Sequence, residues 1–310
     1  MDPLENIDGE RFDAAFGEAV RDRALRALEA GRVLFFPRLA FVFSADERRF
    51  LDPRCSDGRA KNISYDPSSG RLKGTTLTGR ERECLQDMVA RFAQSARHLV
   101  EGLLPSYAPH LGMGRTSYRP VEVKERPSSY RKDDSRLHVD AFPSRPNGGR
   151  RILRVFSNVN PDGHGRIWRL GEPFETCARR FLPAIRSPLP GQRWLLSACG
   201  LTHGYRSAYD HYMLALHNAM KGDDYFQRHC PQYEVTFPAG TTWMVFTDQV
   251  PHAAMAGQYL LEQTFHVPVR GLNEPASAPL SVLERLLGRT LTAATSKSEP
   301  LDPRLVRVEE

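Results

Sequence analysis

Residues 233–269, YEVTFPAGTTWMVFTDQVPHAAMAGQYLLEQTFHVPV, decide the fold class. Short apolar runs alternate here with turn-forming Pro, Gly and Asp residues, a pattern typical of β-strands. Five such runs lie in the second half of the chain: residues 152–159, 194–197, 233–237, 241–247 and 261–269. Many short strands joined by turns favour an antiparallel sandwich or barrel, so we expect a double-stranded β-helix of the jelly-roll or cupin-like kind.

The first third of the chain has a different character. Residues 10–31 are rich in Ala, Leu, Arg and Glu and predict a helix, and the apolar run 33–36 predicts a buried strand. Apolar residues repeat at helical spacing over residues 79–104, which predicts a long helix with one buried face. The expected class is therefore mainly β with helices, α+β, with N-terminal helices packed on the β-core.

We expect a single domain over residues 1–292. Within it, residues 1–105 form a mostly helical N-terminal elaboration, residues 106–270 the jelly-roll core and residues 271–292 a C-terminal helix. Residues 279–287 are amphipathic, and docking on the core is favoured over contact with a membrane. A polar tail follows at residues 293–310.

Charge and composition narrow the classes of partner. Lys and Arg outnumber Asp and Glu by 43 to 37, which favours an anionic partner. No basic run or zinc-finger spacing is present, so we expect no nucleic acid. We also expect a cytoplasmic protein, because the chain shows neither a secretory signal nor a long apolar segment. The five cysteines lack a CxxC pair and are expected to be reduced.

The segment SRLHVDAF, residues 135–142, carries the first candidate site. On an extended strand His138 and Asp140 leave the same face and can reach one metal ion. The spacing alone is unspecific, since ten histidines and 37 carboxylates in 310 residues give about one such pair by chance. His252, which follows an apolar strand, is the candidate third ligand. Two imidazoles and one carboxylate on one octahedral face favour Fe(II) with open positions.

Each of these residues also has a simpler interpretation. His138 and Asp140 can form a local salt bridge, and His252 can be a loop histidine facing solvent. His266 competes with His252 as the third ligand, although its apolar neighbours favour a packed strand residue. His203, His211 and His217 are interpreted as structural or facing the substrate.

A 2-oxo acid that chelates iron needs a cation for its far carboxylate, and arginine matches a carboxylate with two parallel hydrogen bonds. Arg154 is the first candidate, because strand alternation places it on one face with Phe156 and Asn158. A salt bridge within the protein is the alternative role. The surrounding sequence is rich in basic and aromatic residues, and four of them are candidates for binding an anionic substrate: Arg119, Tyr130, Arg166 and Trp168.

Residues 136–174, RLHVDAFPSRPNGGRRILRVFSNVNPDGHGRIWRLGEPF, resemble the bacterial Kdo 3-hydroxylases, whose substrate is 3-deoxy-D-manno-octulosonic acid (Kdo) of lipopolysaccharide. The resemblance extends through His252 to the QTFHVP segment. It implies a jelly roll that uses Fe(II), 2-oxoglutarate and O₂ to hydroxylate C3 of Kdo in Kdo-lipid A, which yields Ko. It also implies that His138, Asp140 and His252 hold the iron.

One feature departs from the wider superfamily. Many relatives place an Arg or Lys ten to fourteen residues after the distal histidine, but residues 262–266 contain none. Arg154 or Arg166 is then expected to hold 2-oxoglutarate. The anionic glycolipid also suggests peripheral contact with the cytoplasmic face of the inner membrane.

Two alternative functions remain open. The first is a 2-oxoglutarate oxygenase that acts on a protein side chain or a small metabolite. The second is a non-catalytic, cupin-like binding module whose metal is structural or absent.

Overall fold

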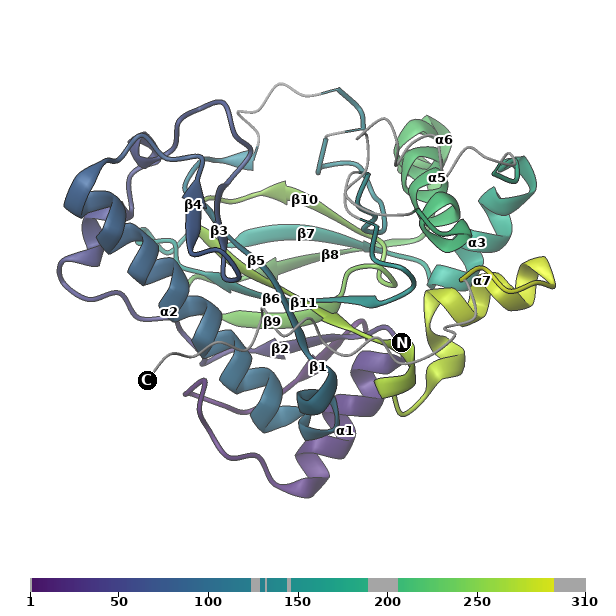
Figure 1. Cartoon of the computed structure of the whole chain (residues 1–310), viewed down its shortest axis with the longest axis horizontal. Helices are drawn as coiled ribbons and strands as arrows, with labels where there is room; N and C mark the ends of the chain where they lie inside the picture. Colours follow the sequence, from purple (N-terminus) through teal and green to yellow (C-terminus); the bar gives the residue numbers. More distant parts are fainter. Residues whose placement is uncertain (1, 124–128, 132, 144–145, 189–205, 293–310) are drawn as a thin grey trace.

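Two β-sheets and two groups of helices make up the fold in this computed structural model (Figure 1). The structure describes residues 2–123, 129–131, 133–143, 146–188 and 206–292. The expected strand at residues 194–197 and the expected polar tail at residues 293–310 lie outside these ranges.

The larger sheet has eight strands, antiparallel except for one parallel pair. Their order across the sheet is β1 (Leu4–Asn6), β2 (Val33–Phe36), β9 (Thr242–Phe246), β6 (Arg151–Asn158), β11 (Leu260–Val267), β5 (Gly112–Arg119), β3 (Ile63–Asp66) and β4 (Arg71–Lys73). The first 105 residues thus supply strands as well as helices, because β1 and β2 extend one edge and β3 and β4 the other. Pairing satisfies the backbone groups that the core strands leave at these edges.

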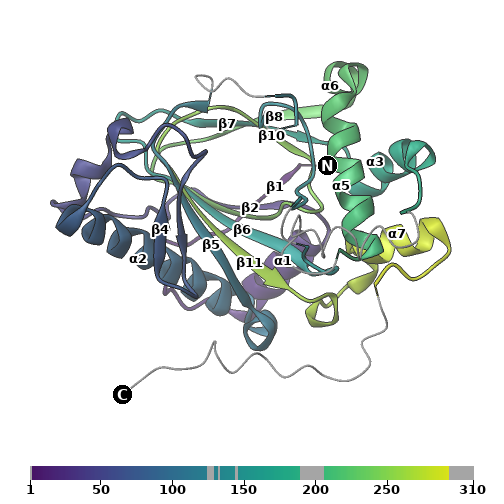
Figure 2. The same cartoon turned by 45° about the horizontal axis from the view of Figure 1, so that its top comes forward.

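The smaller sheet contains β10 (His252–Ala256), β7 (Arg166–Gly171) and β8 (Gln232–Phe237) in antiparallel order. Aromatic side chains of the two sheets pack against each other. The Trp243 ring stacks on Phe237 with centroids 4.0 Å apart and on Phe156 at 5.3 Å. This shared core makes the sheets two walls of one sandwich (Figure 2), and the expected jelly-roll fold is confirmed.

Two helices cover the outer face of the larger sheet (Figure 1). They are α1 (Glu18–Glu29) and α2 (Gly79–Leu103). The apolar stripe expected on α2 is buried, from Leu85 through Phe92 to Leu103, in the core beneath the sheet. Helix α1 begins after Gly17 and is therefore shorter than the helix expected over residues 10–31.

The remaining helices gather at one end of the sandwich. They are α3 (Phe174–Phe181), α5 (Ala208–Gly222), α6 (Asp224–His229) and α7 (Pro279–Leu287). Val282 and Leu283 of α7 are buried in a cluster that these helices share with Leu137 and Val139, the neighbours of the HxD motif. Helix α7 therefore docks on the protein as expected. Within the described residues, no helix is both long and apolar enough to cross a membrane.

Candidate metal centre

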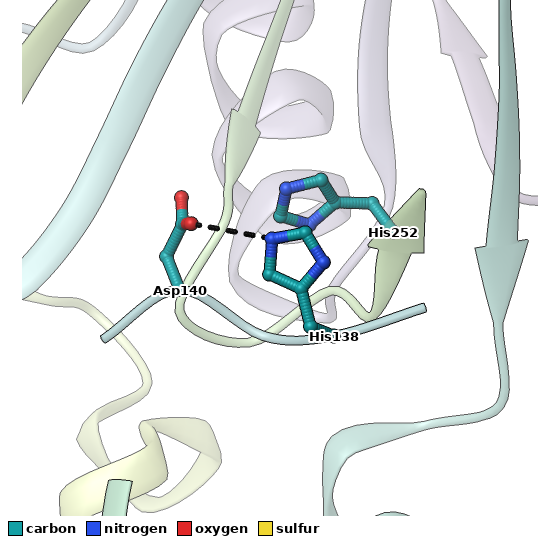
Figure 3. Close-up of side chains that lie close together, drawn as sticks. All are labelled: His138, Asp140 and His252. Carbon is teal, nitrogen blue, oxygen red and sulfur yellow. Dashed lines mark ion pairs between the residues drawn. The ribbon is translucent and has the colours of Figure 1, made fainter. Parts of the chain in front are cut away.

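Backbone pairing brings the two parts of the motif together. The segment around His138 runs along β10, where the His138 amide donates to the His252 carbonyl at 3.1 Å and the His252 amide donates back at 2.8 Å. Two residues on, the Asp140 amide donates to the Thr247 carbonyl at 2.8 Å. Because alternate side chains of an extended segment share a face, His138 and Asp140 both point toward His252 (Figure 3).

The three side chains can hold one metal ion. One ligand atom from each of His138, Asp140 and His252 lies within 4.8 Å of the others, and all three residues are largely inaccessible to solvent. The His138 Nε2 is 3.8 Å from the Asp140 Oδ1, which is too long for a hydrogen bond. This spacing leaves the nitrogen and the oxygen available to a common ion.

Both imidazoles are held in the orientation that metal binding requires. The Nδ1 of His138 lies 2.7 Å from the Arg136 carbonyl, and the Nδ1 of His252 lies 2.9 Å from the Val250 carbonyl. A carbonyl only accepts, so each Nδ1 carries the proton and each Nε2 keeps its lone pair. Burial lowers the pKa of both histidines and so keeps them neutral. The donor set therefore fits a divalent metal.

Asp140 completes the set as a carboxylate. Burial alone would raise its pKa, but the charge of the Arg154 guanidinium group offsets that effect and holds the pKa well below its ordinary value. The Oδ2 of Asp140 lies 3.1 Å from the Arg154 Nη2 yet makes no hydrogen bond within the described residues. The ionised carboxylate, whose Oδ1 lies 3.8 Å from the His138 Nε2, is a suitable metal ligand.

Glu262 is a residue that the sequence reasoning missed. On β11 it pairs with Phe156 of β6 and with Ser117 of β5, so Arg154 and Arg119 are its diagonal neighbours on either side. Its Oε1 accepts from Arg154 at 2.8 Å, and its Oε2 accepts from Arg119 at 2.6 Å. The sequence signal was an acidic residue in a strand of otherwise buried residues, which requires a cationic partner.

The expected cosubstrate and substrate residues occupy different places. Arg154 reaches the triad directly through Asp140. Arg166 and Trp168 share the inner face of β7, where the Trp168 ring stacks on His252 with centroids 5.1 Å apart. The Arg166 Nη1 donates to the Gly257 carbonyl at 2.7 Å. Tyr130 is 45% exposed and contacts the Arg131 guanidinium, so it lies at the surface.

Two more histidines clarify the ligand set. The ring of His217, on α5, lies 4.9 Å from that of His138, and its Nδ1 is bound to the Val139 carbonyl at 2.8 Å. The sequence left His217 as structural or facing the substrate, and the structure places it beside the triad. His266 sits on β11 near Phe142, and the metal-binding group found among the described residues contains His252 in its place.

A comparison with known families decides the identity. Residues 11–290 match the family described as 3-deoxy-D-manno-oct-2-ulosonic acid (Kdo) hydroxylase. This chain belongs to the Kdo hydroxylase family. No curated protein matches the chain.

Solved structures of a Kdo hydroxylase share the fold. The Kdo hydroxylase KdoO, a non-heme Fe(II) alphaketoglutarate dependent dioxygenase, is known in complex with alphaketoglutarate and Fe(III). That structure is 48% identical to this chain, with a TM-score of 0.91, and the match covers 97% of this chain and 100% of KdoO. The cobalt(II) complex of KdoO is 49% identical, with a TM-score of 0.92 over the same shares. The resemblance drawn from residues 136–174 is confirmed.

Proposed function

We propose that this chain is an Fe(II)- and 2-oxoglutarate-dependent dioxygenase that hydroxylates Kdo. The observation that carries the proposal is the buried group of His138, Asp140 and His252, with both Nε2 atoms unprotonated, in a chain of the Kdo hydroxylase family. Three protein ligands leave octahedral positions open for a chelating 2-oxo acid and for O₂. When bound, iron and 2-oxoglutarate supply the oxidising power, and succinate and CO₂ are the by-products.

The residues around the triad provide the cation that 2-oxoglutarate requires. The buried N–H groups that find no acceptor within the described residues include Nε of Arg119, Nε of Arg154 and Nε1 of Trp168. Such groups are costly unless a ligand accepts from them. In this proposal Arg154, with Arg166 as the alternative, holds the far carboxylate of 2-oxoglutarate, and Arg119 and Trp168 line the same space.

The chemistry of the sugar indicates where the oxygen is added. The description of the family to which this chain belongs names a 3-deoxy sugar acid, so C3 of the sugar carries hydrogens and no hydroxyl group. Hydroxylation of C3 converts Kdo to Ko, and we propose Kdo-lipid A as the form of the substrate. His217 lies next to His138 on the side of α5 and is positioned to contact the bound sugar. Tyr130 is exposed, and we propose that it contacts the part of the glycolipid outside the Kdo unit.

The proposed place of action is the cytoplasmic face of the inner membrane. The excess of Lys and Arg over Asp and Glu, 43 to 37, favours approach to an anionic lipid surface. Helix α7 is packed against the protein through Val282 and Leu283. We therefore propose a peripheral contact that does not depend on burying α7 in lipid.

Two measurements test the proposed function. Anaerobic protein mixed with Fe(II) and 2-oxoglutarate should give a weak visible charge-transfer band, and its absence would favour the non-catalytic binding module. Mass spectrometry of Kdo-lipid A after aerobic turnover should show a gain of one oxygen on the Kdo unit. Turnover of 2-oxoglutarate with unchanged Kdo would instead favour a protein or metabolite substrate.

A further inference from the structure

Three cations converge on one carboxylate next to the triad. We call Lys61, Arg119, Asp134 and Lys221 the Asp134 cluster. The Lys61 Nζ lies 2.5 Å from both carboxylate oxygens of Asp134. The Arg119 Nη1 is 3.4 Å from Oδ2, and the Lys221 Nζ is 3.9 Å from Oδ1. Burial alone would raise the pKa of Asp134, but Lys61 and Arg119 hold it well below its ordinary value.

Two structural elements place this cluster at the border of the metal centre. The Asp134 carbonyl accepts from the Ala254 amide of β10 at 2.8 Å, and four residues further along the same segment His138 pairs with His252. Helix α5 approaches from the other side. Lys221 lies one helical turn after His217, whose ring is 4.9 Å from that of His138. The cluster therefore borders the triad without belonging to it.

A network of ion pairs connects the Asp134 cluster to the metal centre. Arg119 links the cluster through Glu262 to Arg154 and Asp140. The connected network contains four cations, Lys61, Arg119, Arg154 and Lys221, and three carboxylates, Asp134, Asp140 and Glu262. The buried cations Arg119, Arg154 and Lys221 are matched by these three carboxylates, and Lys61, whose side chain is 46% exposed, adds a cation on the solvent side.

Lys221 is the buried cation of this network with the longest contacts. Its side chain is 2% exposed. Within the described part of the chain, its ammonium group meets the Arg131 carbonyl at 3.3 Å and the Asp134 carboxylate at 3.9 Å. An ammonium group has three donors, and these long contacts leave it poorly satisfied. Lys61, whose side chain is 46% exposed, opens the same cluster to solvent.

We propose that Lys61 and Lys221 receive the carboxylate of the Kdo sugar, an inference that rests on the proposed function. The carboxyl carbon of Kdo is C1, two bonds from C3. A group that anchors it must therefore border the metal centre while leaving the metal ligands untouched, as the Asp134 cluster does. Asp134 holds the two ammonium groups in place before the sugar binds, and Lys61 provides the approach from solvent.

The test compares an acid with its neutral analogue. The probes are the methyl glycoside of Kdo and the same glycoside with its carboxylate converted to a carboxamide. Binding of each is measured by NMR titration on the full chain loaded with Co(II) and 2-oxoglutarate, so the readout does not depend on turnover. The variants are K61M and K221M, with K61R as the conservative replacement and K73M as the matched control, because Lys73 is an exposed lysine on β4.

The expected result is a loss of discrimination. The wild-type protein and K73M should bind the acid roughly 10 to 100 times more tightly than the amide, the factor of one charge-assisted hydrogen bond. K61M and K221M should bind the two probes about equally, and K61R should keep most of the preference. Because Lys61 is half exposed, K61M remains informative even where K221M fails to fold.

Other outcomes overturn the inference. If K61M discriminates between acid and amide as the wild type does, the cluster is a structural ion network only. If the lysine variants weaken 2-oxoglutarate binding and leave the acid preference intact, these cations belong to the cosubstrate. If the wild-type protein neither binds nor hydroxylates Kdo, the proposed function itself is refuted. This test uses the wild-type protein alone and is therefore separate from the comparison of the lysine variants.

Discussion

Replacing Glu262 by glutamine should loosen the arginines beside the metal centre. In the native chain each carboxylate oxygen accepts from a different guanidinium group, Arg119 at 2.6 Å and Arg154 at 2.8 Å. Glutamine has nearly the same shape but only one accepting oxygen. Its NH₂ group must then face the second guanidinium group, donor against donor, in a site where Glu262 is 3% exposed.

The expected loss of stability follows from the two hydrogen bonds that Glu262 accepts. A hydrogen bond between charged groups contributes about 1.5–3 kcal/mol, and a neutral one about 1 kcal/mol. E262Q loses one charged bond and weakens the other, so we expect the free energy of unfolding to fall by about 3 kcal/mol. For a chain of this size that lowers the melting temperature by about 4–5 °C. The protein should remain folded, because domains typically have about 5–15 kcal/mol of stability.

Calorimetry and steady-state kinetics measure the two consequences. The melting temperature of the E262Q apoprotein should fall by the amount given above. The KM for 2-oxoglutarate should rise about tenfold, which corresponds to about 1.4 kcal/mol, because Arg154 is no longer held in place by Glu262. The matched control is E101Q, which removes a surface pair with Arg97 worth about 0.5 kcal/mol. An E262Q protein as stable as E101Q, with an unchanged KM, would refute the proposed role of Glu262.

Three further predictions concern single residues. H138A should abolish the anaerobic charge-transfer band and lower iron affinity at least 10-fold, measured by metal analysis after dialysis; full retention of iron would remove His138 from the ligand set. R154A should raise the KM for 2-oxoglutarate more than it weakens iron binding, and an unchanged KM would redirect the assignment to Arg166. Burial and the neighbouring Arg150 and Arg154 lower the pKa of His266 from 6.5 to about 4. His266 is therefore protonated at a lower pH in the folded protein than in the unfolded chain. Stability should therefore be lost as pH falls from about 6.5 to about 4, by about 3 kcal/mol, and H266Q should lose less over that range in urea titrations of the apoprotein.

The sequence by itself predicted several of the strands, the long helix and three candidate metal ligands. Apolar runs bounded by turns predict strands, and the two-residue spacing of His138 and Asp140 puts both on one face, because these are local consequences of backbone geometry. The strands expected at residues 152–159 and 241–247 differ from β6 and β9 by one residue at each end. The choice of His252 over His266 came from their sequence contexts, and the family resemblance supplied the class of reaction.

Only the tertiary structure decided what surrounds those ligands. Glu262 lies between Arg119 and Arg154 because β11 is hydrogen-bonded to both β5 and β6, strands distant in sequence. His217 and Lys221 meet the triad because α5 packs across the segment that holds Val139. Such neighbours depend on strand order and helix packing, for which a single sequence carries no local signal. The sequence therefore predicted the candidate metal ligands, and the fold decided which charges stand beside them.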